Sequence, residues 1–482
     1  INTIVSDVIP NMAEILLATD KATIATTQAG IATTKAAEAS ASAVAAATFV
    51  PALYVPRADV IGAIGNINSP LLDLPLNNSL SMKSGVGSVT FTRASTATYI
   101  DRYGVLKTAA IDEPRFEKDG MLVEGASTNL LTYSEDFTNG VWVKPNLTIS
   151  SNTATTLDPY GTNVADRLVD NLLTNPKSIH QPVSISAGST YTTYVFAKED
   201  LTSSKRYLNL SMTENIVATN NYSYARFDLA TGTITAKTLN DSSYFTANSA
   251  TIKAIGNGWY ICSITSTILT YTTIRVRIGM TALPTGVTGA ASGLLSYTGD
   301  GTSGLYIFGA QLEALPFATS YIPTVASTVT RIVDNCTVAF ENNCNSLEKD
   351  HTIIVDVKQH GLGGNVYILS VDGLPSIDSR VLKIYGTTGN IWDFYNGVSE
   401  LIYISNPLAT NRVSSVVKSA ELLKYSYANG VLDASKAITL MTVNKGTTIS
   451  IGRRAAGAGM YGHISNIRIY DKALTPTEVA LS

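Results

Sequence analysis

The sequence has little charge, little cysteine and little histidine. Of its 482 residues only 15% are charged, the formal net charge is -3, and no run of basic residues is longer than Arg453-Arg454. Because nucleic-acid-binding domains carry a basic patch, we do not expect a nucleic-acid partner. Three cysteines exclude a disulfide framework; free thiols are expected, with a Cys336–Cys344 pair as the alternative. Four histidines without a CxxC motif argue against a structural zinc site.

Long apolar runs and enzyme motifs are also missing. No run of 18 apolar residues exists, so we expect no membrane insertion. No signal-peptide pattern is visible, and the opening at Ile1 within a helical pattern indicates part of a longer protein. The chain has no GxSxG, HExxH, Walker or dinucleotide motif and no β-helix repeat. The sequence therefore does not predict an enzyme.

An alanine-rich seam dominates the N-terminal part of the chain. Between residues 4 and 46, apolar residues recur at alternating steps of four and three, and nine consecutive seam positions are alanine. This period of 3.5 residues predicts a left-handed coiled-coil stem over residues 1–50, with the polar Asn11 setting the register. A flexible Ala/Thr/Ser-rich linker is the alternative. The seam residues are Asn11, Ile15, Ala18, Ala22, Ala25, Ala29, Ala32 and Ala36. Such a stem predicts a homo-oligomer, for which we expect a homotrimer.

Beyond the stem the pattern becomes that of a β protein. Residues 51–84 form a connector rich in Pro and Gly, and afterwards short alternating segments recur between turn signals. We predict a mainly β fold, in which the α-helical stem precedes two β-sandwich (jelly-roll) domains. The first covers residues 85–328 and includes an N-terminal β extension, and the second covers residues 329–482. Short helices are expected at 163–172 and, capped by Thr475, at the C-terminal end.

Two runs of sequence carry a resemblance to a known class of proteins. They are RASTATYIDRYGVLKTAAIDEPRFEKDGMLVEGASTNLLTYSEDFTNGVW and FGAQLEALPFATSYIPT. They resemble tail-fibre, tail-spike and head-spike proteins of tailed phages, in which the first run opens a carbohydrate-binding-module-like sandwich and the second closes it. The ending GHISNIRIYDKALTPTEV resembles laminin-G-like, concanavalin-type lectin domains.

The resemblance implies a virion protein that is made in the host cytoplasm and meets the host surface. We expect a tail fibre or spike that binds bacterial surface polysaccharide through several non-catalytic sites and contacts other tail proteins on its N-terminal side. A capsule-degrading spike and a structural connector that docks other virion proteins are the alternatives. Glycoside hydrolysis needs two carboxylates beside a cleft, and the nearest such group is Glu348-Lys-Asp350, at a predicted strand start.

Sugar sites combine aromatic rings with amide and carboxylate groups. The segment 390–397 interleaves both kinds of residue, although one face of a strand there must also be apolar core. Trp142 and Trp259 are expected in the core. The glycan-binding candidates are Trp392, Asp393, Tyr395 and Asn396, followed by Tyr222 and Tyr224 in a predicted loop. No cofactor is expected; Ca²⁺ is left open, with Asp300 as either a ligand or a turn residue.

Overall fold

The computed structural model divides the chain into two compact units, residues 1–66 and 67–482. It describes seven residues between 26 and 36 and most of the second unit. The second unit is described over residues 69–482, apart from 154–155, 216–220, 240, 285–293, 345–347, 362–365, 373–379, 385–390, 396–399, 405–411, 440–445 and 454–458.

The described residues of the first unit are helical and exposed, and they include three seam residues, Ala29, Ala32 and Ala36. The hydroxyl of Thr33 donates to the carbonyl oxygen of Ala29 at 2.9 Å. The other seam residues, Asn11, Ile15, Ala18, Ala22 and Ala25, lie outside the described residues. A single helix of this kind has nothing to bury against. The described residues therefore do not support a coiled-coil stem, which stays a prediction together with the homotrimer.

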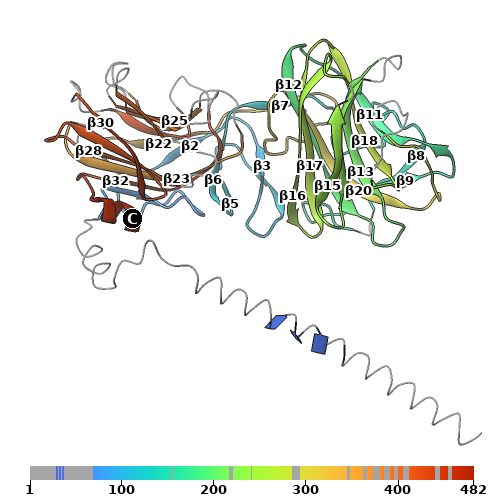
Figure 1. Cartoon of the computed structure of the whole chain (residues 1–482), viewed down its shortest axis with the longest axis horizontal. Helices are drawn as coiled ribbons and strands as arrows, with labels where there is room; N and C mark the ends of the chain where they lie inside the picture. The colour runs from blue at the N-terminus through green and yellow to red at the C-terminus, as the bar shows by residue number, and fades with distance from the viewer. Residues whose placement is uncertain are drawn as a thin grey trace, which may run out of the picture. The chain divides into compact units, whose positions relative to one another are not determined.

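The second unit contains one β-sandwich inserted into another. We call residues 126–328 the inserted sandwich; its strands are green to yellow in Figure 1. One sheet has the order β16-β17-β12-β20-β9-β8 and the other the order β11-β18-β13-β14-β15. The strands of the six-stranded sheet are β8 (Leu147–Ser150), β9 (Asp166–Asp170), β12 (Ser189–Glu199), β16 (Phe245–Gly256), β17 (Trp259–Ile268) and β20 (Gly304–Glu313). The strands of the five-stranded sheet are β11 (Lys177–Ser184), β13 (Tyr207–Glu214), β14 (Tyr222–Asp228), β15 (Thr233–Leu239) and β18 (Thr273–Thr281). A short pair, β10 (Thr174–Asn175) and β19 (Tyr297–Thr298), lies beside them.

The period-2 pattern of the inserted sandwich produces two apolar faces on β12. Val195 and Ala197 point into the core between the two sheets. Tyr194 and Phe196 belong instead to an aromatic cluster on the opposite face of the six-stranded sheet. This second face is buried because other parts of the chain cover it, and that covering helps to build the site described below.

We call the other domain the split sandwich, because its strands come from both sides of the inserted sandwich. In Figure 1 the blue strands β2, β5 and β6 are drawn among its orange and red strands. Its eight-stranded sheet contains β1 (Leu72–Leu74), β5 (Arg115–Glu117), β6 (Gly120–Glu124), β23 (His351–Gln359), β28 (Arg412–Lys418), β29 (Leu423–Ala428), β30 (Val431–Ala437) and β32 (Tyr461–Tyr470). Its seven-stranded sheet contains β2 (Thr90–Thr92), β22 (Asn335–Ala339), β24 (Val366–Asp372), β25 (Arg380–Ile384), β26 (Ile391–Tyr395), β27 (Glu400–Ile404) and β31 (Thr448–Ile451).

This topology corrects the prediction of which sandwich contains the N-terminal strands. The β extension, expected to belong to the first sandwich, pairs with the second: β2 with β22, and β6 with β32. Even β1, within the predicted connector, pairs with β32. The alternating pattern identifies a strand but does not identify its partner. The prediction of a helix at 163–172 is also wrong, because residues 166–170 form strand β9, which lies between β20 and the edge strand β8.

One hairpin of this extension lies against the inserted sandwich. It consists of β3 (Ala97–Ile100) and β4 (Leu106–Ala109), and Leu106 joins the aromatic cluster on the six-stranded sheet. Its turn includes Gly104, which has a φ of +81°. A Cβ atom there would lie 1.8 Å from the carbonyl oxygen of Ile255 on β16, so only glycine permits this approach. The hairpin thus connects the two sandwiches.

Several local predictions are confirmed. The mainly β fold is as expected, and the C-terminal helix α3 (Pro476–Leu481) has Thr475 as its N-cap in a capping box with Glu478. The three cysteines are free and buried. None of the helices in the described part of the chain is long and apolar enough to span a membrane.

Candidate functional site

The chain passes between the two sandwiches twice, and the two passages pair with each other. They are β7 (Ser127–Asn129) and β21 (Val329–Arg331), which form an antiparallel ladder. The hydroxyls of Thr128 and Thr330 lie 2.8 Å apart across it. Both connections of the inserted sandwich therefore meet at one place.

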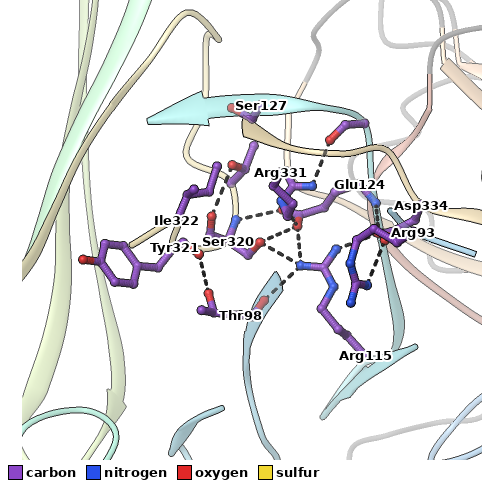
Figure 2. Close-up of polar contacts among 12 residues, drawn as sticks. Arg93, Thr98, Arg115, Glu124, Ser127, Ser320, Tyr321, Ile322, Arg331 and Asp334 are labelled. Atoms are coloured by element: carbon purple, nitrogen blue, oxygen red, sulfur yellow. Dashed lines mark hydrogen bonds and ion pairs between the residues drawn. The ribbon is translucent and has the colours of Figure 1, made fainter. Parts of the chain in front are cut away.

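A buried network of ions surrounds this junction (Figure 2). The guanidinium of Arg115 donates from Nη1 to Glu124 Oε2 at 2.7 Å and from Nη2 to Asp334 Oδ2 at 2.6 Å. Arg93 Nη1 donates to the second oxygen of Asp334 at 3.2 Å, and Arg331 Nε lies 3.4 Å from Glu124 Oε2. All five side chains are at most 1% exposed. Each buried charge thus has an opposite charge beside it, which such burial requires.

The carboxylate of Glu124 also binds the last segment of the inserted sandwich. Ser320 donates to Glu124 through its backbone N–H at 2.8 Å and through its hydroxyl at 2.6 Å. The hydroxyl of Thr98 donates to the carbonyl oxygen of Tyr321 at 2.6 Å. The run that closes the inserted sandwich is therefore hydrogen-bonded to strands of the split sandwich and of the hairpin.

Charge pairing controls the ionisation of this network. Burial alone would raise the pKa of Glu124, but Arg331, Arg115 and the hydrogen bonds of Ser320 outweigh it and place that pKa far below its usual range. Burial would likewise lower the pKa of Arg115, but Asp334 and Glu124 raise it. Both groups are ionised at neutral pH, so the network is a fixed structural element.

Beside the junction lies a cleft with a volume of about 530 Å³. The inserted sandwich, the β3–β4 hairpin and the split sandwich all contribute to its walls. Its apolar lining includes Ile100, Leu106, Leu122, Phe196, Ile261 and Phe317. Its polar lining includes Thr98, Ser249, Thr251, Lys253, Ser263, Thr265, Glu117, Asp119, Lys358 and His360. An apolar lining with a few polar groups is typical of a small-molecule or oligosaccharide site.

The ionisable groups of the cleft form two paired sets. His463 Nε2 lies 3.0 Å from Glu117 Oε2, and His463 Nδ1 lies 3.2 Å from Nε2 of His360. Asp119 accepts a hydrogen bond from Lys358 Nζ at 2.6 Å. These contacts connect β5, β23 and β32, so the cleft wall is rigidly supported by the eight-stranded sheet.

These pairs keep the cleft carboxylates ionised. Burial alone raises the pKa values of Glu117 and Asp119, but the hydrogen bonds and charges of His463 and Lys358 outweigh it, so both values lie below normal. Burial and the neighbouring His463 lower the pKa of His360 to about 4. At neutral pH His360 is therefore uncharged.

The structure places the predicted glycan candidates in two regions apart from one another in the sequence. Trp392, Asp393 and Tyr395 lie on β26, where only the backbone is described, and Asn396 lies outside the described residues. Tyr222 and Tyr224 lie on β14 and not in a loop, and they are 8% and 1% exposed. Neither Tyr222 nor Tyr224 lines the cleft. Their role in binding stays a prediction.

The other candidates have structural environments. Trp142 and Trp259 are each 1% exposed, as expected for core residues. Asp350 Oδ1 accepts hydrogen bonds from the backbone N–H and the hydroxyl of Ser419, both at 2.7 Å. The carboxylate of Asp300 accepts from Thr302, Ser303 and the Arg206 guanidinium, so its oxygens are already occupied by donors.

A calcium ion does not fit the Asp300 turn. Cation ligands need free carboxylate or carbonyl oxygens, whereas Asp300 is bonded by N–H and O–H groups and an arginine. Within the described residues no group of three or more His, Cys, Asp or Glu side chains lies close enough to hold a metal.

Sequence reasoning missed the cleft residues, although several lie in the quoted runs. Glu117 and Asp119 belong to the first run and Phe317 to the second, and His463, which contacts Glu117 and His360 of the lining, belongs to the C-terminal one. The first two runs were expected to open and close one sandwich, and the C-terminal run was expected to close the other. Their meeting at one cleft depends on the insertion, for which no local pattern exists.

Comparison with known proteins identifies the fold of the C-terminal part. A family model described as "Concanavalin A-like lectin/glucanases superfamily" matches residues 318–480. This part of the chain has a laminin-G-like lectin fold. The match leaves out β1, β2, β5 and β6, which complete the split sandwich.

Several solved structures show detectable similarity to parts of the chain. The CBM40 of the Ruminococcus gnavus IT-sialidase is 17% identical, with 27% of this chain and 81% of that chain covered and a TM-score of 0.24. Domain 4 of AbnA, an arabinanase from Geobacillus stearothermophilus, is 17% identical, with 34% and 79% covered and a TM-score of 0.26. Domains LG4-5 of the mouse laminin alpha1 chain are 11% identical, with 63% and 90% covered and a TM-score of 0.22. No protein of curated function matches the chain.

Proposed function

We propose that this chain is a subunit of a tailed-phage tail fibre or spike that binds bacterial surface polysaccharide without cleaving it. The observation that carries the proposal is the cleft at the junction of the two sandwiches. The lectin fold of residues 318–480 and the resemblance of the two sequence runs support the same function.

The lining of the cleft matches the chemistry of a sugar chain. Phe317 and Ile261 provide apolar surface for the C–H faces of sugar rings, whereas Thr251 and Ser263 provide hydroxyls. Lys253, an exposed residue of the same wall, adds a charged donor. The volume of about 530 Å³ lies within the usual range for ligand sites. A short stretch of polysaccharide fits these properties.

The ionisation of the cleft favours binding over hydrolysis. Glycosidases need one carboxyl group with a raised pKa that donates a proton to the leaving oxygen. The lining carboxylates Glu117, Asp119 and Glu124 all have lowered pKa values, so each is ionised at neutral pH. This arrangement supports the non-catalytic reading over the capsule-degrading alternative.

Several copies on one axis would strengthen weak binding. The proposed trimeric stem of residues 1–50 would hold three clefts together, and each additional contact with one polysaccharide would then be intramolecular. Other tail proteins would bind on the N-terminal side of the stem.

A cleft-filling substitution tests the proposal. Thr251 is exposed and lines the cleft, whereas Ala254 is exposed on the same strand but does not line it. The full chain should retain surface polysaccharide from the phage's host and leave its length unchanged. Thr251→Trp should weaken retention at least tenfold, and Ala254→Trp should not.

The other outcomes identify the alternatives. Shortened polysaccharide after incubation would replace the binding proposal with an enzyme. Absence of retention, together with phage adsorption that Thr251→Trp leaves unchanged, would favour the structural connector.

A further inference from the structure

The outer face of the five-stranded sheet carries an arginine pair. On β18, Arg275 and Arg277 alternate with Ile274, Val276 and Ile278, which are fully buried in the core. The two arginines therefore point away from the core, and both are half-buried. They lie on the same face of one strand, two residues apart.

The groups that contact these arginines are uncharged acceptors. Arg277 Nε donates to the hydroxyl of Thr213 at 3.2 Å, and its Nη1 lies 3.4 Å from His180 Nδ1. Arg275 Nε donates to the side-chain oxygen of Asn215 at 3.1 Å. The described contacts thus orient both guanidinium groups without neutralising them.

The strands of this sheet contain two carboxylates, and each is bound by other groups. Glu214 accepts from the Tyr271 hydroxyl at 3.1 Å and from the backbone N–H of Asn221 at 3.2 Å. Asp228 accepts from Lys205 Nζ at 2.8 Å. The segments 216–220 and 285–293 contain no acidic residue either. Within the described residues neither carboxylate forms an ion pair with Arg275 or Arg277.

The ionisation of the neighbours agrees with this geometry. Burial and then the charge of Arg275 lower the pKa of Arg277 to about 10. Burial and then the charges of Arg277 and Arg275 lower the pKa of His180 to about 3. An anion placed here would relieve this repulsion.

A second observation also indicates a ligand. Strand pairing places Ser211 directly opposite Arg277, with Tyr224 on its other side. Ser211 is fully buried, and within the described residues its hydroxyl has no hydrogen-bond partner. Such groups are rare because they lose the hydrogen bonds that water would provide. The hydroxyl therefore has an unused donor on the face that carries Arg277.

We infer that Arg275, Arg277 and Ser211 form a binding site for the carboxylate of an acidic glycan, distinct from the cleft. The inference rests on the proposed function and adds the class of sugar. A guanidinium fork matches the two oxygens of a carboxylate, and the serine hydroxyl supplies a further donor to one of them.

Titration calorimetry with the full chain tests this site. The probes are trigalacturonate and its methyl ester, which has nearly the same shape but no charge. We expect trigalacturonate to bind, and the ester to bind at least tenfold more weakly. Arg277→Met should reduce the affinity for trigalacturonate at least tenfold. Lys237→Met is the matched control, since it removes one exposed positive charge from the same sheet and should change the affinity less than twofold.

Three results would overturn the inference: no binding of trigalacturonate, equal binding of acid and ester, or an equal loss in the two variants. Each leaves the proposed function standing if polysaccharide retention still depends on Thr251. Conversely, loss of that dependence would refute the cleft proposal, whatever the calorimetry gives.

Discussion

Two of the groups of buried or half-buried arginines in the described residues differ in what faces them. At the junction, Arg115 is bonded to both Glu124 and Asp334. On the outer face of the five-stranded sheet, Arg275 and Arg277 contact neutral acceptors. Matched charges connect parts of the fold, whereas unmatched charges are available to something outside it. This difference separates a structural network from a candidate binding site.

The largest expected effect comes from removing a charge at the junction. Glu124→Gln should lower the free energy of unfolding by about 3–5 kcal/mol, because Arg331 would remain buried without its carboxylate and Arg115 would keep only Asp334. Urea unfolding of the full chain measures it. The control Glu421→Gln affects an exposed ion pair with Lys418 and should cost less than about 1 kcal/mol. Equal effects of the two variants would contradict the structural role of the network.

A smaller effect is expected for the hydroxyl that links the inserted sandwich to this network. Ser320→Ala removes one hydrogen bond to the ionised Glu124 and should cost about 2 kcal/mol. In the Glu124→Gln background the same substitution should cost less, because its charged acceptor is gone. Additive losses in this double-mutant cycle would show that the two residues act independently.

The sequence predicted the fold class and several local features more successfully than the topology. The N-cap Thr475 with Glu478 depends only on neighbours along the chain, so the local pattern was sufficient. The partners of β2 and β6 depend on contacts more than 200 residues away, as in the bonds from Glu124 and Arg115 to Asp334. No local period records such pairings.

The candidate sites show the same limit. Tyr222 and Tyr224 were predicted to bind glycan because they are aromatic, but burial on β14 leaves little of either residue accessible. Their significance instead comes from their strand neighbours, since Tyr224 is paired with Ser211 and thereby lies close to Arg277. Single residue types could not predict this arrangement, because it requires three strands in register.

The lowered pKa of His360 in the cleft predicts how the stability of the chain depends on pH. The folded pKa of His360 is about 4, below its ordinary value, so the unfolded chain binds an additional proton between about pH 6.5 and 4. The contribution of His360 to the free energy of unfolding is therefore complete above about pH 6.5 and decreases as the pH falls. The groups that influence it are His463, Glu124, Lys253 and Glu117.

His360→Gln should therefore reduce the loss of stability between pH 6.5 and 5 by about 1.5 kcal/mol. Urea unfolding at these two pH values measures the difference. Lys358→Met, which changes a neighbouring residue of the cleft, should leave the loss unchanged. A loss that is the same in His360→Gln and the unmodified chain would contradict the lowered pKa.

The smallest effect on stability is expected for Arg277, which has no carboxylate partner among the described residues. Arg277→Met removes a charge that repels Arg275 and also removes a hydrogen bond to Thr213, so the two contributions oppose each other. We expect a change in the free energy of unfolding within about 0.5 kcal/mol, as for an ordinary surface substitution. Because salt screens the repulsion, the free energy of unfolding of the variant, relative to that of the unmodified chain, should be highest at low ionic strength. Urea unfolding at low and high salt measures both points. A cost above about 2 kcal/mol would mean that Arg277 supports the fold as Arg115 does, and the contrast between matched and unmatched charges would then fail.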